Sequence, residues 1–440
     1  MRRILANRTY RHLFLAQMIA LIGTGLATVA LGLLAYDLAG ADAGAVLGTA
    51  LAIKMVAYVG VAPVATALAE RLPRRALLVG LDLARAGVAV LLPFVTQVWE
   101  VYLLIFVLQS ASAAFTPTFQ ATIPDVLTDE AEYTRALSLS RLAYDLESLV
   151  SPILAAALLT VIGFHDLFAG TVAGFIISAV LVGSTVLPAS TPAGRQSIYN
   201  RATRGLRIFR ATPRLRGLLA LNLAIAAAGA MVIVNTVVLV QAEFGLGQRA
   251  TALALAAFGA GSMIAALLLP RLLNDISDRT VMLSGAAVLA AGLSGGGLVA
   301  DLGVLLLLWF ALGLGCSLAQ TPSGRLLRRS SQPQDRPPLF AAQFMLSHAC
   351  WLITYPAAGW LGATVGLSAT FAVLGGVAAL AAVAAIRLWP AFDPDEIEHV
   401  HRMLDADHPH LRGAVTVGAG HRHAHAYTID HHHPEWPRST

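Results

Sequence analysis

Twelve long apolar stretches constrain this chain more than any other feature of its sequence. Each has roughly the 20 apolar residues that a helix needs to cross a hydrocarbon core about 30 Å thick. Because backbone polar groups must be satisfied inside a bilayer, we predict that each stretch forms a transmembrane helix. The stretches run over residues 13–37, 44–69, 76–94, 99–118, 137–161, 166–188, 217–241, 249–270, 281–300, 303–321, 339–363 and 367–388.

The composition supports an all-α integral membrane protein. Of the 440 residues, 57% are hydrophobic and only 12% are charged, which is too few charges to cover a soluble protein of this length. Cys316 and Cys350 both lie in apolar stretches, so they predict neither a disulfide framework nor a paired zinc motif. The arginines are dispersed between apolar stretches, which argues against nucleic acid as a partner.

The positions of the arginines predict the orientation in the membrane. They concentrate before the first stretch, after the second, between the sixth and seventh, and after the tenth. The alternate connections carry mainly acidic residues, including Asp37, Glu100 and Asp301. By the positive-inside rule, we expect both termini in the cytoplasm of a bacterial cell and the helices in its inner membrane. The basic start runs into the first stretch without a cleavage site, so that helix should remain as an anchor.

Weak internal symmetry predicts two six-helix bundles. The segment "ERLPRRALLVG" follows the second stretch and "DISDRTVMLSG" follows the eighth, in matching places of the two halves. We therefore divide the chain into an N-terminal bundle over 1–188, a basic linker over 189–216 and a C-terminal bundle over 217–388. Residues 389–440 form a histidine-rich tail, for which we expect a short amphipathic helix over 392–410 and then a disordered end.

The connection after the second stretch, "TALAERLPRR" at 66–75, resembles the G-x-L-A-D-R-x-G-R-R loop of the major facilitator superfamily of secondary transporters. It departs from that pattern at Thr66, Glu70 and Pro73. The resemblance implies a fold of twelve transmembrane helices, alternating access between two halves, and a monomer. It also implies a loop gate, whose candidate residues are Glu70, Arg71, Arg74, Arg75, Asp82 and Arg85. Asp82 and Arg85 lie one helical turn apart, so they can equally form a structural ion pair.

A second stretch, "FTPTFQATIPDVLTDEAEYTRALSLS" at 115–140, resembles the macrolide-efflux-like branch of drug:proton antiporters. Nickel-resistance exporters of the NreB type are similar to this branch and carry a histidine-rich cytoplasmic tail. The resemblance implies proton-driven export, in which the partners are the lipid bilayer, protons and a small cargo.

Charged residues within the stretches are candidates for proton coupling, because each needs a partner or a task inside a bilayer. Lys54 is the only lysine of the chain and lies in the middle of the second stretch. Arg141 and Asp145 are spaced to pair on one helix face, whereas Glu147 points elsewhere. A desolvated carboxylate that leaves its basic partner can take up a proton near neutral pH. A static network of ion pairs remains the alternative for all four residues.

Other polar residues within the stretches suggest a cargo pathway. Met345 and His348 share a helix face and can bind a transition metal with an acid from another helix, although a lone histidine often serves packing. Five amides fall in stretches that border the central cavity of this superfamily, where they suit either an aqueous pathway or helix-to-helix hydrogen bonds. They are Gln17, Gln109, Asn222, Asn235 and Gln320.

The tail holds ten of the 13 histidines. Their runs are broken, unlike an affinity tag, so we interpret them as a native feature. Neutral imidazole binds nickel, copper, cobalt and zinc, and it predominates in the cytoplasm because its pKa is about 6.5. The predicted tail ligands are His421, His423, His425, His431, His432 and His433.

Together these patterns predict a transporter and no enzyme, with no cofactor other than a transported or tail-bound divalent metal. The preferred function is proton-coupled efflux of a divalent transition metal, nickel or cobalt, for which the tail would collect ions near the cytoplasmic mouth. Two alternatives stay open. The same cavity could export amphipathic organic compounds or drugs, or the protein could be a membrane metal sensor that moves no cargo.

Overall fold

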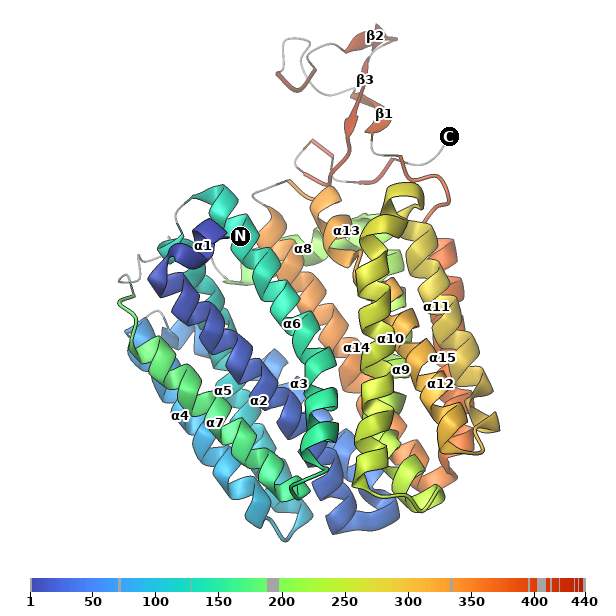
Figure 1. Cartoon of the computed structure of the whole chain (residues 1–440). Coiled ribbons are helices and arrows are strands. Elements are labelled where there is room, and N and C mark those ends of the chain that lie inside the picture. Colours follow the sequence, from blue (N-terminus) through green and yellow to red (C-terminus); the bar gives the residue numbers. More distant parts are fainter. Residues whose placement is uncertain are drawn as a thin grey trace.

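A bundle of long helices carries a small sheet at one end (Figure 1). The computed structural model describes residues 2–69, 73–127, 129–187, 198–332, 335–394, 396–401, 409–411, 414–418, 420–430, 432–433 and 435–437. The long helices are α2 (Arg8–Ala39), α3 (Ala43–Ala69), α4 (Arg74–Leu91), α5 (Val98–Val126), α6 (Glu130–Leu158), α7 (Leu167–Gly183), α9 (Pro213–Val237), α10 (Gln248–Asp275), α11 (Asp278–Gly295), α12 (Leu302–Gln320), α14 (Arg336–Val365) and α15 (Leu367–Leu388). Each overlaps one apolar stretch of the sequence, so the prediction of an all-α membrane fold is confirmed.

Within the described residues, nine segments are long and apolar enough to cross a membrane. The first, Arg8–Val61, includes α2 and part of α3. The long helices that these segments omit are α6 and α14, which carry Glu147 and His348. The chain is therefore a multi-pass membrane protein.

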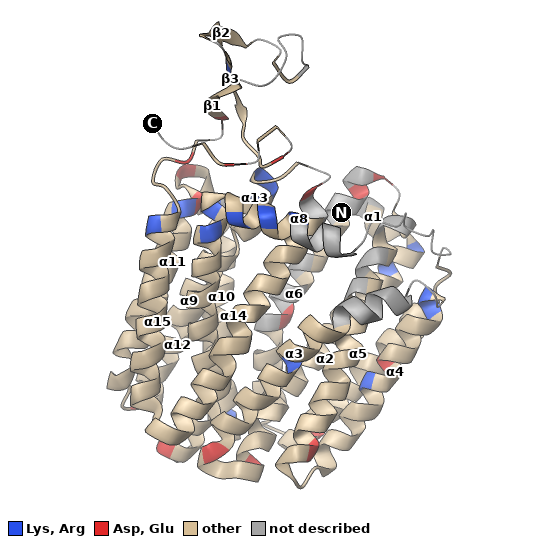
Figure 2. Ribbon diagram, turned by 180° about the vertical axis from the view of Figure 1, so that it is seen from behind, with Lys and Arg blue, Asp and Glu red and all other residues tan. Residues whose placement is uncertain are grey.

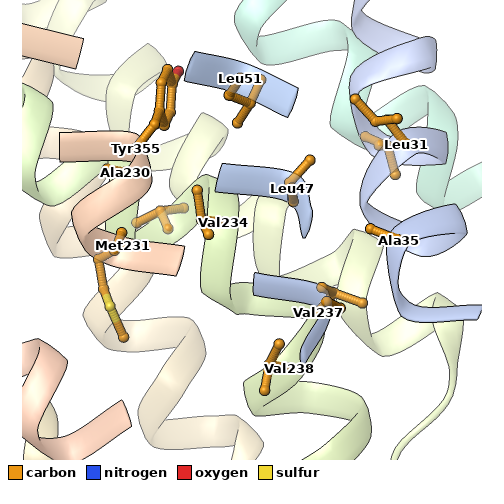
Figure 3. Close-up of a cluster of buried hydrophobic side chains, with 14 of the residues drawn as sticks. Leu31, Ala35, Leu47, Leu51, Ala230, Met231, Val234, Val237, Val238 and Tyr355 are labelled. Atoms are coloured by element: carbon orange, nitrogen blue, oxygen red, sulfur yellow. The ribbon is translucent and has the colours of Figure 1, made fainter. Parts of the chain in front are cut away.

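The two halves share an apolar core at the end of the bundle opposite the tail, which we call the far end. Figure 3 shows Leu47 of α3 lying between Leu31 of α2, also in the N-terminal half, and Val234 of α9 in the C-terminal half. Among the described residues, the core clusters at the tail end each belong to one half. The far end is thus where packing holds the halves together.

Small residues and two hydrogen-bonded contacts tighten this far-end packing. A Cβ on Gly48 of α3 would lie 2.5 Å from the Tyr355 carbonyl oxygen of α14, and one on Gly359 would meet the Gly44 carbonyl. Glycine is therefore required for the close approach of α3 to α14. The indole N–H of Trp360 donates to Thr49 Oγ1 over 3.1 Å. Arg249, at the start of α10, donates to the Leu159 and Thr160 carbonyls at the end of α6.

Charge separates the two ends of the bundle. Figure 2 shows Lys and Arg concentrated at the tail end, around α8 (Ile198–Ala211), α11 and α13 (Ser323–Arg329). The far end shows mainly Asp and Glu. This is the asymmetry expected from the alternating connections of the sequence.

The tail differs from our prediction. The described residues form a three-stranded antiparallel sheet of β1 (Glu396–His401), β2 (Val415–Val417) and β3 (Gly420–Ala426), in the order β1-β3-β2. The predicted amphipathic helix over 392–410 is wrong at β1, and the predicted disorder is wrong for the strands. The physical reason lies in the alternating histidines of β1 and β3, because a period of two places them on one face of a sheet.

The tail packs onto the C-terminal half. Tyr427 and Ile429 are buried in one cluster with Phe209 of α8, Leu327 of α13 and Trp389, which follows α15. The segment that follows β3 is therefore packed against α8, α13 and the residue after α15, whereas the strands stand away from the bundle (Figure 1).

Candidate functional site

The predicted intramembrane residues Lys54, Glu147 and His348 form one polar set, although they come from three helices. Lys54 of α3 interacts electrostatically with Glu147 of α6 and with His348 of α14. Since α14 belongs to the C-terminal half, the set spans both halves. We call it the intramembrane set.

Aromatic rings fix the position of His348. Its ring centroid lies 5.7 Å from that of Tyr58 and 3.9 Å from that of Phe344. Its Nδ1 lies 2.7 Å from the Phe344 carbonyl oxygen, to which Nδ1–H can donate. Lys54 Nζ lies 6.0 Å from the centroid of the same Tyr58 ring. This arrangement suits a packed histidine and leaves Nε2 as the nitrogen that can bind a cation.

The N-terminal half supplies the polar wall around Lys54. A pocket beside this lysine is lined by Thr24 and Thr28 of α2, Gln109 of α5 and Phe175 of α7, among others. Glu147 lies close to α2, because a Cβ on Gly25 would come within 2.7 Å of its Oε1. The carboxylate and the ammonium thus enter one region from α6 and α3.

Asp82 and Arg85 pair with each other inside the N-terminal half. Both side chains are buried and in ion-pair contact. Ser178 Oγ donates to Asp82 Oδ2 over 2.7 Å, and the Arg85 guanidinium lies 4.1 Å from the Phe115 centroid and 4.5 Å from that of Phe175. Phe175 therefore connects this ion pair with the pocket beside Lys54.

Several predicted residues lie outside the described part of the structure. These are Glu70 and Arg71 of the loop gate, and the side chains of Arg141 and Asp145 on α6. Arg74 and Arg75 begin α4, the first half-buried and the second exposed.

The five amides fall into different environments. Gln17 accepts from Ser140 Oγ over 3.0 Å, Asn222 donates to Gln343 Oε1 over 3.3 Å, and Asn235 donates to the Ala358 carbonyl over 3.0 Å. Each of these bonds joins two helices, which supports the packing alternative. Gln109 lines the pocket, and Gln320 is exposed at the end of α12.

Among the described residues, neither cysteine shares a metal-binding group with His348. Cys316 and Cys350 are buried and form no disulfide, and Met345 is half-buried one turn before His348 on α14.

In the tail, six histidines converge on one point. His399 Nε2 lies 3.1 Å from His401 Nε2, 3.1 Å from His423 Nε2 and 3.0 Å from His433 Nε2. His433 Nε2 also lies 3.2 Å from His401 Nε2 and 3.3 Å from His410 Nε2. One nitrogen of each of His399, His410, His423, His425 and His433 lies within 4.8 Å of all the others. We call His399, His401, His410, His423, His425 and His433 the imidazole cluster.

These distances match those between ligands around a metal ion. With metal–nitrogen bonds of about 2.0–2.1 Å, adjacent nitrogens lie about 3.3 Å apart in a tetrahedron and about 2.9 Å apart in an octahedron. A neutral imidazole has one N–H and one lone pair, so the nitrogens cannot all be satisfied by one another. Nitrogen ligands suit nickel, copper, cobalt and zinc. The cluster can therefore hold such an ion.

The protonation state of the rings favours metal binding as well. Burial, followed by repulsion from neighbouring imidazoles, lowers the pKa of His401 and His423 to about 4. Burial also lowers the pKa of His433 to about 4, although Asp430 opposes that shift. These rings are neutral at neutral pH, which is the form that ligates metal.

The cluster differs in membership from the predicted tail ligands. His423, His425 and His433 belong to it as predicted, whereas His431 lies outside the described residues. His432 stacks on His410 at 5.3 Å, and His421 pairs in register with His401. Sequence reasoning did not select His399, His401 and His410, although the H-x-H spacing of 399–401 was a signal that could have identified β1.

Comparisons with known proteins agree with this architecture. The family model of the Major Facilitator Superfamily matches residues 13–239 and 219–402. An uncharacterized MFS-type transporter, YfiS of Bacillus subtilis, is 23% identical over 326 residues, which cover 71% of this chain and 77% of that protein. Macrolide efflux protein A of Streptococcus pyogenes is 27% identical over 152 residues, which cover 32% of this chain and 37% of that protein.

A crystal structure of a D-xylose-proton symporter superposes with a TM-score of 0.64 at 14% identity, covering 88% of this chain and 97% of that one. This likeness supports the fold alone. Since the family match extends over both helical halves, the chain belongs to the Major Facilitator Superfamily and is a secondary transporter of that type.

Proposed function

We propose that the protein exports a divalent transition metal, nickel or cobalt, from the cytoplasm in exchange for protons. The observation that carries this proposal is the convergence of the Nε2 atoms of His399, His401, His423 and His433 at one end of the transporter. Positive charge concentrates at the same end, which supports a cytoplasmic tail in a bacterial inner membrane. Ions held in the tail would be concentrated beside the entrance.

Competition for the carboxylate of Glu147 would couple export of the cation to entry of protons. Glu147 can be neutralised by Lys54, by a proton or by a cation that also reaches His348. Because a single carboxylate accepts only one of these at a time, entry of a proton releases the cation. The shared far-end core is the closed gate in this state, and rocking of the two halves would open it.

Transport in proteoliposomes tests this proposal. An imposed proton gradient should drive Ni²⁺ or Co²⁺ against its own gradient, and added metal should move protons in the opposite direction. The full chain is compared with a chain stopped after Pro394, which keeps Trp389 in the core of the C-terminal half and Asp393 as its hydrogen-bond partner. Removal of the tail should weaken metal export at low metal concentration without stopping it.

A second candidate is export of amphipathic organic compounds, supported by the similarity to a macrolide efflux protein and by Tyr58 and Phe344 beside His348. Proton-coupled flux of a hydrophobic drug without metal flux would assign the cargo to this candidate. Metal binding without flux of either cargo would instead identify a membrane sensor.

A further inference from the structure

The carboxylate of Asp430, which lies outside the imidazole cluster, orients one ring of the cluster. We call it the outer partner. His433 Nδ1 lies 2.9 Å from Asp430 Oδ1, so Nδ1–H donates to the carboxylate and Nε2 is left with its lone pair toward the cluster. The backbone N–H groups of His432 and His433 donate to the same oxygen over 2.8 Å each. A carboxylate behind a histidine fixes its tautomer and raises its basicity as a metal ligand.

The same carboxylate reaches the body of the transporter. Asp430 Oδ2 accepts from Gln332 Nε2 over 2.9 Å, and Gln332 lies in the connection between α13 and α14. A continuous path of contacts therefore runs from the cluster through His433 and Asp430 to Gln332, in the connection between α13 and α14.

The other end of the sheet is anchored to the same half. Asp393, three residues before β1, pairs with Arg214 of α9 at 3.1 Å and with Arg329 of α13 at 3.2 Å. Trp389 Nε1 donates to the same carboxylate over 2.9 Å. The Arg214 guanidinium also lies 5.0 Å from the ring centroid of Trp436, near the end of the tail.

These two anchors place the cluster between fixed points. β1 begins beside Asp393, whereas His433 and Asp430 lie after β3, so the cluster joins the first and last parts of the tail. An ion bound by both His399 and His433 would link the first part of the tail to the last part. Without an ion, the sheet itself and Asp430 connect its two ends.

We infer that the cluster is a regulatory metal site, in which the bound ion fixes the tail on α13 and α9 and so alters the movement of the C-terminal half. This role goes beyond the proposed export function and holds for either cargo. Linkage makes it reciprocal: if metal strengthens docking of the tail, then weaker docking must weaken metal binding by the same factor. The site takes a borderline divalent cation with imidazole ligands.

Metal binding and amide hydrogen exchange of the purified full chain test the inference without any transport assay. Co²⁺ is the probe, because its visible absorption reports binding and coordination geometry. In the wild-type protein, Co²⁺ should slow exchange in 427–433 and also in 326–332. Slowing that is confined to the tail, or no Co²⁺ binding at all, would overturn the inference.

Two variants test the roles of Asp430 and Gln332 without removing any metal ligand. Asp430→Asn should lower the Co²⁺ affinity by about 10–100-fold, the usual cost of losing such a partner. Gln332→Ala removes no ligand, so it should still give the Co²⁺ spectrum. Because it removes one docking contact, it should reduce the Co²⁺-dependent protection of 326–332 and, by linkage, lower the Co²⁺ affinity by the same factor. Glu398→Gln is the matched control, since Glu398 is an exposed acid that pairs with Arg422 on the same sheet.

An unchanged affinity in Asp430→Asn, or protection of 326–332 that is undiminished in Gln332→Ala, would refute the path through Asp430. Loss of Ni²⁺ or Co²⁺ transport bears only on the proposed export function. Both variants are read by binding and exchange, so the two proposals fail separately.

Discussion

The intramembrane set and the imidazole cluster are two polar centres of this molecule, and they are built differently. Lys54, Glu147 and His348 are unlike groups that come from helices of both halves. The cluster is made of identical imidazoles held by one small sheet and the segments that flank it. The first is therefore sensitive to any movement between the halves, whereas the second can keep its geometry while they move.

Because of this difference, we expect proton coupling to depend on the intramembrane set and metal affinity to depend on the imidazole cluster. A group that exchanges a proton must lose and regain its partner, which requires unlike charges on elements that move. A site that retains an ion needs several equivalent ligands at fixed separations. We therefore expect substitutions in the two centres to have separable effects, and the following changes test that expectation.

Glu147→Gln should have the largest effect. It removes the carboxylate that we propose as the proton carrier, so proton-driven exchange should fall by at least about 100-fold, the scale of losing a proton-transfer group. Co²⁺ binding to the tail should stay at the wild-type level. Flux in proteoliposomes and Co²⁺ absorption measure the two quantities.

The exposed acid Glu398 supplies the control, because Glu398→Gln should leave exchange unchanged. Wild-type exchange in Glu147→Gln would eliminate Glu147 as the proton carrier. Asp145, on the same helix, would then be the acid to change.

Replacing both His399 and His433 with alanine should have the next largest effect, this time on the other centre. These two rings make most of the short contacts between Nε2 atoms. The Co²⁺ affinity of the tail should therefore fall by more than the roughly 10–100-fold cost of losing the outer partner Asp430. Proton-driven exchange at saturating cargo should persist. An equal loss of binding and exchange would mean that the two centres act as one.

Gly359→Ala should perturb the closed far end. Its new Cβ would meet the Gly44 carbonyl of the opposite half, and overpacking of this kind costs about 1–3 kcal/mol. Accessibility of a cysteine introduced at the far end should therefore increase. Gly376→Ala on α15 is the matched control, because its Cβ would meet nothing within 4 Å. Equal accessibility in both variants would show that α3 and α14 do not form the closure.

Thr49→Val should have the smallest effect. It removes the hydrogen bond from Trp360 that crosses the halves, and such a bond contributes about 0.6 kcal/mol in a membrane. The same cysteine accessibility should rise only slightly. Thr364→Val removes a bond within α14 and serves as its control, so a larger effect there would assign the change to the helix and not to the closure.

Much of the fold could be predicted from the sequence because bilayer thickness sets the length of each apolar stretch. The Asp82–Arg85 pair followed from its spacing of one turn, since partners on one helix are local. The intramembrane residues were found singly, as costly charges or a histidine, but their meeting depends on how three helices pack. No local pattern contains that information.

The tail shows more clearly which features could not be predicted from the sequence. His399 meets His423 and His433, which are 24 and 34 residues away along the chain. Strand pairing creates this proximity, and register is specified by contacts between strands and not within one segment. A high count of polar residues favoured disorder, whereas burial of Tyr427 and Ile429 against α13 supplies the apolar packing that the tail alone lacks.

The converging imidazoles also affect how this protein can be purified and measured. A chelating nickel resin should retain the untagged chain through a folded surface, and imidazole in the eluting buffer would compete with its own ligands. A polyhistidine affinity tag would add a second binder of similar chemistry, so any titration would count two populations of ion. Binding studies therefore call for a tag without histidine and for a chelator wash before the first metal is added.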